Sequence, residues 1–398
     1  MGKIAIMGFG TVGSGIRDII KKQNYHAEEK VEIGHILDIR DFSGDEDAKL
    51  FTKEFTDILE DSEITVVAEA MGGLHPAYEF TKELLLAGKS VVTSNKELVA
   101  TYGVELLAIA EEKNVNYMFE ASVGGGIPII RPLATCLAAN RVERIVGILN
   151  GTTNYILTEM FQKGKTFEDA LKDAQNKGYA ERNPAADVEG HDACRKIAIL
   201  SSLAWGKFVD YQDISTEGIC EITAEDVQYA EKLGCVIKLI GYAECDENDK
   251  VFARVSPMLI PKACPIAGVD DVFNAIMVTG DSLGDAMFYG RGAGKLPTAS
   301  AVVADVLDCL RHEGTKKHYR SWKVSDVPFM KKTEESRVSY FVRTPEDYDK
   351  VKAVFGEVNR IDAAEGTAFI TPIETEAVLS EKFRALGNIT SRLRMLDA

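Results

Sequence analysis

Long apolar runs, cysteine pairs and an excess of basic residues are all missing from this sequence of 398 residues. No apolar stretch reaches the roughly 20 residues that a membrane-spanning helix needs, and the N-terminus lacks the features of a signal peptide. The seven cysteines stand singly, which predicts neither a zinc site nor a disulfide framework. A net charge of -16 would repel nucleic acid and anionic membranes. These absences predict a soluble, cytoplasmic protein that binds neither nucleic acid nor a membrane.

The sequence does have enough apolar residues for a large core, and its clearest local pattern lies at the N-terminus. Lys3 to Met7 form an apolar segment typical of a strand, which runs through "GFGTVGSG" into a helix with an apolar face. In this setting the glycines of G-x-G-x-x-G allow a tight turn, the approach of a pyrophosphate and close helix packing, and the helix N-terminus binds phosphate. The pattern predicts dinucleotide contacts by Gly8, Phe9, Gly10, Thr11, Val12 and Gly13.

The choice between NAD and NADP depends on the end of the next predicted strand. Asp38 lies there, and Arg40 follows two residues later. An acid at this place hydrogen-bonds the ribose hydroxyls of NAD, whereas an arginine pairs with the 2′-phosphate of NADP. The sequence allows both cofactors, and we favour NADP with Arg40 as its ligand.

Strands and helices then alternate, which predicts an α/β fold with a doubly wound parallel sheet. The ends of the later strands place Gly72, Ser94 and Lys96 in the cofactor crevice. Lys96 opens a predicted helix, where a cation opposes the helix dipole. It is therefore either a first-turn lysine of a surface helix or a functional cation.

The middle of the chain begins with "RVERIVGILNGTTNYILTEM". We expect a strand, a turn at Asn150 and Gly151, and a helix capped by Thr152 or Thr153. A second helix then ends at Gly178.

The stretch that follows, "YAERNPAADVEGHDACRK" over residues 179–196, gathers charged groups around a proline and a glycine. A helical pattern puts Asp192 and Lys196 four residues apart on one face, which is usually an ordinary surface salt bridge. The alternative is a site in which the bent loop brings Glu181 and Asp187 to the same lysine. Such a site suits a substrate with an amino group and a reducible carbonyl, because the acids accept the ammonium and the lysine protonates the alkoxide.

These residues resemble the signature of homoserine dehydrogenases, an asparagine- or aspartate-proline followed by D-[aliphatic]-x-G-x-D-x-x-x-K. The matching positions are Asn183, Pro184, Asp187, Val188, Gly190, Asp192 and Lys196. The segments "GFGTVGSG", "NGTTNYIL" and "GRGAGKLPTASAVVADVLD" resemble the same family, and the resemblance covers about residues 1–325. Because the chain starts at the dinucleotide fold, it resembles the monofunctional form and not the form fused to an aspartate kinase.

The resemblance implies NAD(P)H-dependent interconversion of L-aspartate 4-semialdehyde and L-homoserine, in threonine, methionine and isoleucine biosynthesis. By the same match, Lys196 would donate a proton to the aldehyde oxygen and Lys96 would polarise that oxygen from the cofactor side. The substrate would be held by Glu181, Asp187, Asp192 and Tyr179. The nicotinamide end of the cofactor would lie near Gly178, Gly292 and Gly294.

The family resemblance also implies a bound metal ion and a partner subunit. A sodium ion would be held mainly by backbone carbonyls of "EASVGGG", at Glu120, Val123, Gly125 and Ile127. The protein would be a homodimer joined through the sheet of its middle domain.

We expect three domains. An NAD(P)-binding Rossmann domain would span residues 1–130 and be completed by a returning helix near 297–320, whose small residues allow close packing. An α+β domain for substrate binding and dimerisation would span 131–296. A small α+β domain over 335–398 has the β-α-β-β-α-β order of an ACT domain, a module that binds amino acids. The D-x-P-G turn of that family is replaced by "RTPED", so the domain either binds an effector or serves oligomerisation.

Three other functions remain as alternatives. The first is another NAD(P)-dependent amino-acid dehydrogenase. The second is a semialdehyde dehydrogenase with Cys194 as nucleophile, although the nearby Asp192 would raise the pKa of that thiol. The third is a non-catalytic regulator that senses a nucleotide or an amino acid, for which the two lysines Lys96 and Lys196 would have no use.

Overall fold

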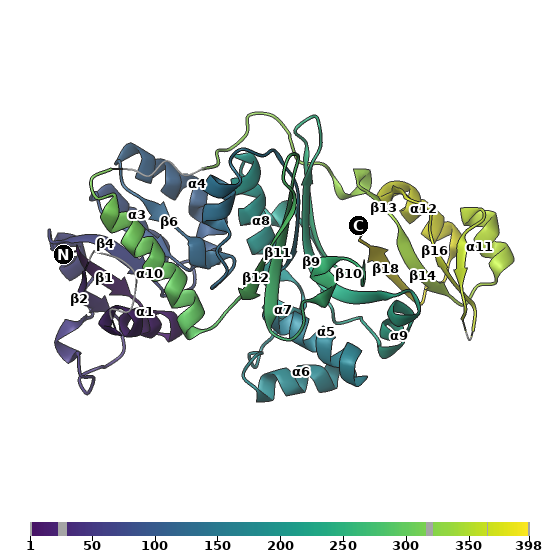
Figure 1. The fold of residues 1–398 in the computed structure, drawn as a ribbon, viewed down its shortest axis with the longest axis horizontal. Coiled ribbons are helices and arrows are strands. Elements are labelled where there is room, and N and C mark those ends of the chain that lie inside the picture. Colours follow the sequence, from purple (N-terminus) through teal and green to yellow (C-terminus); the bar gives the residue numbers. More distant parts are fainter. Residues whose placement is uncertain (1, 23–29, 316–320, 364, 397–398) are drawn as a thin grey trace. The chain divides into compact units, whose positions relative to one another are not determined.

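A parallel six-stranded sheet forms the centre of one of the two units into which this computed structural model divides (Figure 1). The structure describes residues 2–22, 30–315, 321–363 and 365–396. Unit 1 comprises Met1–Val142, Ala198–Asp213 and Val278–Asp326, and unit 2 comprises Glu143–Ile197, Ile214–Met277 and Val327–Ala398. No helix in the described part of the chain is long and apolar enough to cross a membrane.

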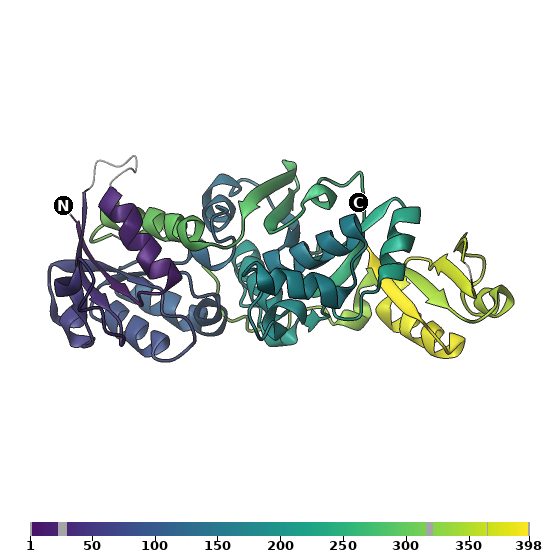
Figure 2. The same ribbon diagram turned by 90° about the horizontal axis from the view of Figure 1, so that it is seen from below.

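The sheet of unit 1 has the strand order β3-β2-β1-β4-β5-β6, and all its neighbouring strands are parallel. Ile4 and Ile6 of the central strand are fully buried, as expected where helices cover both faces of a sheet (Figure 2). The predicted doubly wound α/β fold is confirmed. Its strands are β1 (Gly2–Met7), β2 (Val31–Leu37), β3 (Phe51–Thr52), β4 (Ile64–Glu69), β5 (Ser90–Thr93) and β6 (Tyr117–Met118), and its helices include α1 (Thr11–Lys22), α2 (Thr56–Glu60), α3 (Ala77–Leu86) and α4 (Lys96–Glu112).

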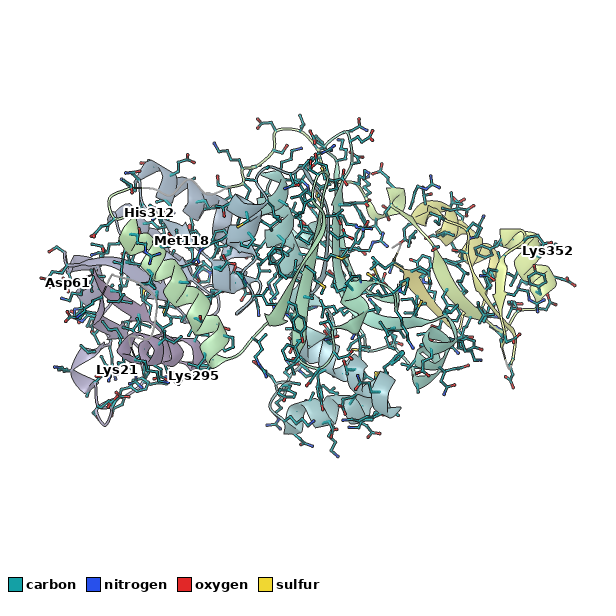
Figure 3. All side chains as sticks on the ribbon, viewed as in Figure 1. Lys21, Asp61, Met118, Lys295, His312 and Lys352 are labelled. Carbon is teal, nitrogen blue, oxygen red and sulfur yellow. The ribbon has the colours of Figure 1, made fainter. Side chains whose placement is uncertain are left out.

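The returning helix is present as α10 (Lys295–Arg311), which packs side by side with α1 (Figures 1 and 2). A Cβ on Gly15 of α1 would lie 2.9 Å from the Cβ of Ala299, so small residues do allow the close approach. Lys295, labelled in Figure 3, pairs with Asp18 of α1 at 2.7 Å. Residues 316–320 of the predicted helix lie outside the described residues.

The sheet of unit 2 is mixed and has the strand order β11-β7-β9-β10-β18-β14-β16-β15, with β8 beside β10. Its longest pair is antiparallel and joins β9 (Cys235–Cys245) to β10 (Val251–Pro261). The remaining strands of its first part are β7 (Val142–Ile148), β8 (Ser215–Thr216) and β11 (Phe273–Gly280), and β12 (Gly284–Arg291) follows in unit 1. The helices are α5 (Gly151–Lys163), α6 (Phe167–Asn176), α7 (Ala185–Val188), α8 (His191–Trp205) and α9 (Ala224–Lys232).

The C-terminal region contains the predicted β-α-β-β-α-β order in β14, α11, β15, β16, α12 and β18, and it has its own apolar core. Two short strands that were not predicted, β13 and β17, pair with each other in a separate sheet. Its last strand, β18, pairs with β14 on one side and runs parallel to β10 on the other, with Met258 opposite Arg394. The region therefore extends the sheet of unit 2. Its elements are β13 (Arg337–Val338), β14 (Tyr340–Thr344), α11 (Tyr348–Phe355), β15 (Asn359–Ile361), β16 (Thr367–Ile370), β17 (Glu374–Thr375), α12 (Glu376–Leu386) and β18 (Ser391–Met395).

Candidate active site

The predicted cofactor loop of unit 1 has the backbone that its glycines suggested. Gly8 takes a positive φ of 89°, which glycine adopts without strain. A Cβ on Gly13 would lie 1.9 Å from the carbonyl oxygen of Gly8, so α1 can pack this closely on the loop only with glycine there. By contrast, a Cβ on Gly10 would meet nothing within 4 Å. The loop therefore leaves open space at the glycine that should face a pyrophosphate.

The two residues that separate NAD from NADP are bonded to each other. Asp38 accepts hydrogen bonds from Arg40 at both carboxylate oxygens, from Nε at 2.9 Å and from the terminal nitrogen at 2.8 Å. It also accepts the backbone N–H of Phe9 at 2.8 Å, which ties the glycine loop to the end of β2. The Arg40 guanidinium holds the pKa of the Asp38 carboxyl well below its usual range. Because the Arg40 side chain is 57% exposed, it remains accessible to a phosphate.

A buried hydrogen-bond network fixes the backbone on which Lys96 stands. Glu69 ends β4 and is fully buried, which raises the pKa of its carboxyl. It accepts the hydroxyl of Thr93 at 2.5 Å and the backbone N–H of Met71 at 2.8 Å. Asn95 donates to the carbonyl of Gly73 at 2.6 Å and caps α4 by accepting the N–H of Leu98 at 3.1 Å. These bonds hold the loops after β4 and β5 together at the start of α4, whose first residue is the half-buried Lys96. The predicted cofactor contacts Gly72 and Ser94 belong to these two loops.

Two further glycine-rich loops of unit 1, at residues 124–126 and 290–294, lie against each other. A Cβ on Gly125 would lie 2.3 Å from the carbonyl oxygen of Gly292, and the N–H of Gly126 donates to the carbonyl of Arg291 at 3.1 Å. Gly294 has a φ of 123° and immediately precedes α10. The predicted cofactor residues Gly292 and Gly294 therefore belong to a loop that packs on the segment predicted to hold sodium.

Of the four residues predicted to bind sodium, Glu120 has its carboxylate engaged elsewhere. The carboxylate oxygens accept the backbone N–H groups of Ile129, Ile130 and Arg131 at 2.6, 2.8 and 2.9 Å. The side chain thus caps a short helical segment, and only the Glu120 carbonyl could serve a cation. In the loops of the described residues, no backbone N–H donates to the carbonyls of the other three, Val123, Gly125 and Ile127. A hard cation bound by carbonyl oxygens fits these groups.

The Asp192 and Lys196 pair of unit 2 is buried, and it is not a surface salt bridge. The Lys196 Nζ donates to the Asp192 carboxylate at 2.8 Å and to the Leu149 carbonyl at 2.7 Å, and both side chains are less than 10% exposed. Gly190 takes a φ of 87° just before α8 and lets the chain turn into the helix. We call Leu149, Asn150, Asp187, Asp192 and Lys196 the lysine cluster.

Asn150 connects this cluster, although its place in the sequence predicted only a turn. Its Nδ2 donates to Asp187 at 2.7 Å and to Asp192 at 3.0 Å. Its Oδ1 accepts the N–H of Thr153 at 2.9 Å, so Asn150 caps α5, and the predicted cap by Thr152 or Thr153 was wrong. The available signal was the strong preference for asparagine at helix N-caps. One side chain therefore starts a helix and brings two carboxylates together.

The other predicted substrate contacts lie around the end of α6. Gly178 has a φ of 74° and follows the helix. Tyr179 accepts the hydroxyl of Thr152 at its carbonyl, at 2.6 Å. Glu181 has an exposed side chain, and its carbonyl accepts a hydrogen bond from the Gln175 side chain at 3.2 Å. Asp187 thus joins the lysine cluster through its hydrogen bond to Asn150. The hydrogen bond of Glu181 to Gln175 makes no such link to the cluster.

Cys194 does not offer the accessible thiol that the alternative nucleophile would need. It lies on α8 and is only 4% exposed. Reactive cysteines are partly exposed, whereas buried structural cysteines are inert.

Two features define the class of protein. The doubly wound domain carries a strand, G-x-G-x-x-G and a helix, and the lysine cluster is a buried group of a lysine and carboxylates. Together they are typical of an NAD(P)-dependent oxidoreductase. Residues 8–120 match the family model for the NAD binding domain of homoserine dehydrogenase, and residues 128–307 match the model for homoserine dehydrogenase. The chain belongs to the homoserine dehydrogenase family and has that activity in aspartate-family amino-acid biosynthesis.

Individual relatives agree with the family models. The homoserine dehydrogenase of Synechocystis sp. is 44% identical over 77% of this chain and 72% of its own. The crystal structure of a homoserine dehydrogenase from Thiobacillus denitrificans matches with a TM-score of 0.91 and 36% identity, over 100% of this chain and 98% of that one. A hyperthermophilic archaeal homoserine dehydrogenase in complex with NADPH matches with a TM-score of 0.68 and 28% identity, over 78% of this chain and 98% of that one.

Proposed function

We propose that Lys196 is the proton donor when L-aspartate 4-semialdehyde is reduced to L-homoserine. A nicotinamide cofactor would supply the hydride, and the reduction would leave a negative charge on the former aldehyde oxygen. An ammonium group held in a buried site stabilises that charge and supplies the proton. The observation that carries the proposal is the pair of hydrogen bonds from the Lys196 Nζ to Asp192 and Leu149, which fix the amine in a buried position.

We propose that the carboxylates of the lysine cluster bind the ammonium group of the substrate. Asp187 is partly exposed, and its carboxylate is held by Asn150 at 2.7 Å. Asp192 shares its carboxylate between Asn150 and Lys196, so it orients the proton donor as well. Tyr179 and Glu181 are proposed as further substrate contacts at the adjoining loop.

In the cofactor domain, Lys96 is proposed to polarise the same oxygen. The support is its place as the first residue of α4, on a backbone that Glu69 and Asn95 fix. The cofactor is proposed to bind along the glycine loop, with Gly72, Ser94, Gly178, Gly292 and Gly294 as additional contacts.

We infer that NADP is preferred, with the 2′-phosphate bound by Arg40. The exposed guanidinium supports this assignment, and the archaeal relative was solved with NADPH.

A sodium ion is proposed at the carbonyls of Glu120, Val123, Gly125 and Ile127. Four expectations stay predictions: the homodimer through the middle domain, the three domain boundaries, the cytoplasmic location and the role of the ACT-like region.

The proposed substrate contacts can be tested with a substrate that lacks the ammonium group. Oxidation of L-homoserine and of 4-hydroxybutanoate should be measured for the wild type and for Asp187→Asn, with NADP and with NAD. The variant should raise the KM for homoserine roughly 10- to 100-fold, as expected for a lost hydrogen bond between charged groups, and leave the KM for the analogue nearly unchanged. An equal change for both substrates would show that Asp187 does not recognise the ammonium.

A further inference from the structure

A short segment of unit 2, residues 215–219, supports the loop that turns into α8, and none of the roles above uses it. We call this segment the strap. The N–H of Ile219 donates to the carbonyl of Val188 at 2.8 Å, and a Cβ on Gly218 would lie 2.3 Å from that same oxygen. On the other side, a Cβ on Gly190 would lie 3.0 Å from Cγ2 of Thr216. The loop between Asp187 and Asp192 therefore sits directly on the strap, with no room for even one added carbon.

The strap is attached in turn to the C-terminal region. Its strand β8 pairs with β10, and the N–H of Glu217 donates to the carbonyl of Val255 at 2.8 Å. The Glu217 carboxylate accepts a hydrogen bond from the guanidinium of Arg394, in β18, at 2.6 Å. Arg394 is only 7% exposed, whereas Glu217 is 47% exposed. A buried residue of the C-terminal region thus holds the outer side chain of the strap.

Arg394 is itself fixed by a buried group of charges. Its Nε donates to Glu376 at 2.8 Å, and Arg254 of β10 donates to the same carboxylate at 2.7 Å. The hydroxyl of Tyr340 donates to Glu376 at 2.8 Å. Hydrogen bonds between buried charges are strong and hold their members in one arrangement. The Arg394 guanidinium is therefore held in a fixed position, and from there its Nη1 donates to Glu217.

We propose that Glu217 and Arg394 are positioning residues for the substrate, through which the C-terminal region sets the place of the Asp187 carboxylate. The path runs from Arg394 to Glu217, from the strap to Val188 and Gly190, and from that loop to the acids on either side. This inference rests on the proposed binding of the substrate ammonium by Asp187 and Asp192. A displacement of about 1 Å in a positioning group is enough to change catalysis strongly.

Glu217→Gln is the variant that tests the proposal, because it removes the charge from a half-exposed side chain and buries no unpaired group. We expect the KM for homoserine to rise roughly tenfold, as a misplaced contact would cause, with kcat within about twofold of the wild type and the affinity for NADPH unchanged. Hydrogen exchange of the backbone amides over residues 185–192 should become faster.

Glu225→Gln is the matched control. Glu225 is 58% exposed and pairs with Arg343, which is 8% exposed, so this pair repeats the same chemistry in the same unit. It lies on α9, and its ion pair joins that helix to Arg343 and not to Arg394. We expect its KM for homoserine and its exchange over residues 185–192 to equal those of the wild type.

The outcomes separate this proposal from the substrate assignment when Asp187→Asn is measured beside both variants. A normal KM and normal exchange in Glu217→Gln, with a raised KM in Asp187→Asn, would overturn the positioning role and leave the substrate contact in place. Equal effects of Glu217→Gln and Glu225→Gln would also overturn it, since loss of any ion pair would then suffice. An unchanged KM in Asp187→Asn would overturn the substrate contact and this inference with it.

Discussion

The cofactor loop and the lysine cluster place their polar groups in opposite ways. The cofactor loop uses consecutive residues, and its shape depends on what glycine leaves out, as the 1.9 Å between the Cβ position of Gly13 and the Gly8 carbonyl shows. The lysine cluster uses groups from residues up to 47 apart in sequence, and one amide, that of Asn150, joins its two carboxylates. The cofactor loop should therefore lose its shape when atoms are added to its glycines. The lysine cluster should lose its activity when hydrogen-bonding groups are removed.

The broadest effect, on stability and on cofactor binding together, is expected from adding one carbon to the cofactor loop. Gly13→Ala would push α1 away from the Gly8 carbonyl, and overpacking of this kind costs about 1–3 kcal/mol of stability. Both the melting temperature and the affinity for NADPH should fall, as measured by calorimetry and by fluorescence titration.

Gly10→Ala is the matched variant, because its added carbon meets no protein atom within 4 Å. It should keep the melting temperature and lose only affinity for NADPH. If Gly13→Ala proved as stable as Gly10→Ala, the account of the close helix packing would be wrong.

A narrower effect, on catalysis without a loss of cofactor binding, is expected when the amide of the lysine cluster is removed. Asn150→Ser keeps an oxygen that can cap α5 but removes the donors to Asp187 and Asp192. We expect kcat/KM for homoserine to fall roughly 10- to 100-fold, since hydrogen bonds to charged groups contribute about 1.5–3 kcal/mol. The affinity for NADPH should stay the same.

Thr166→Ala controls for the loss of a helix cap, because Thr166 caps α6 through the N–H of Asp169. It should lower stability slightly and leave kcat/KM unchanged. A loss of activity in this control as large as in Asn150→Ser would assign the effect to helix capping.

The smallest effect concerns cofactor choice. Arg40→Ala should weaken NADPH binding about tenfold and NADH binding much less, because only the 2′-phosphate needs the guanidinium. Dissociation constants for both nucleotides give the comparison. Equal weakening would mean that Arg40 acts through its bonds to Asp38 and not through the phosphate.

Sequence patterns predicted the features that depend on neighbouring residues. The glycine loop, the alternating strands and helices of unit 1, and the pair Asp192 and Lys196 all follow from local spacing, and the structure shows them. The β-α-β-β-α-β order of the C-terminal region was also visible. Each of these features depends on residues that lie close together in the sequence, within one helix, strand or turn or in the order of neighbouring elements.

Features that depend on tertiary contacts were missed. The bridging role of Asn150 requires the end of β7 to meet a loop 37 residues further along the chain. The capping role of the Glu120 carboxylate requires backbone groups from a later segment. The assignment of Glu181 as a substrate contact stays a prediction, since the hydrogen bond of this residue to Gln175 is made by its carbonyl.

The most direct test of the central claim compares kcat and cofactor affinity in Lys196→Ala. Removal of a positioned proton donor should lower kcat for homoserine oxidation on the order of 10²- to 10⁴-fold and leave the dissociation constant for NADPH within about twofold of the wild type. Turnover close to that of the wild type, or a loss of NADPH affinity as large as the loss of kcat, would contradict the account.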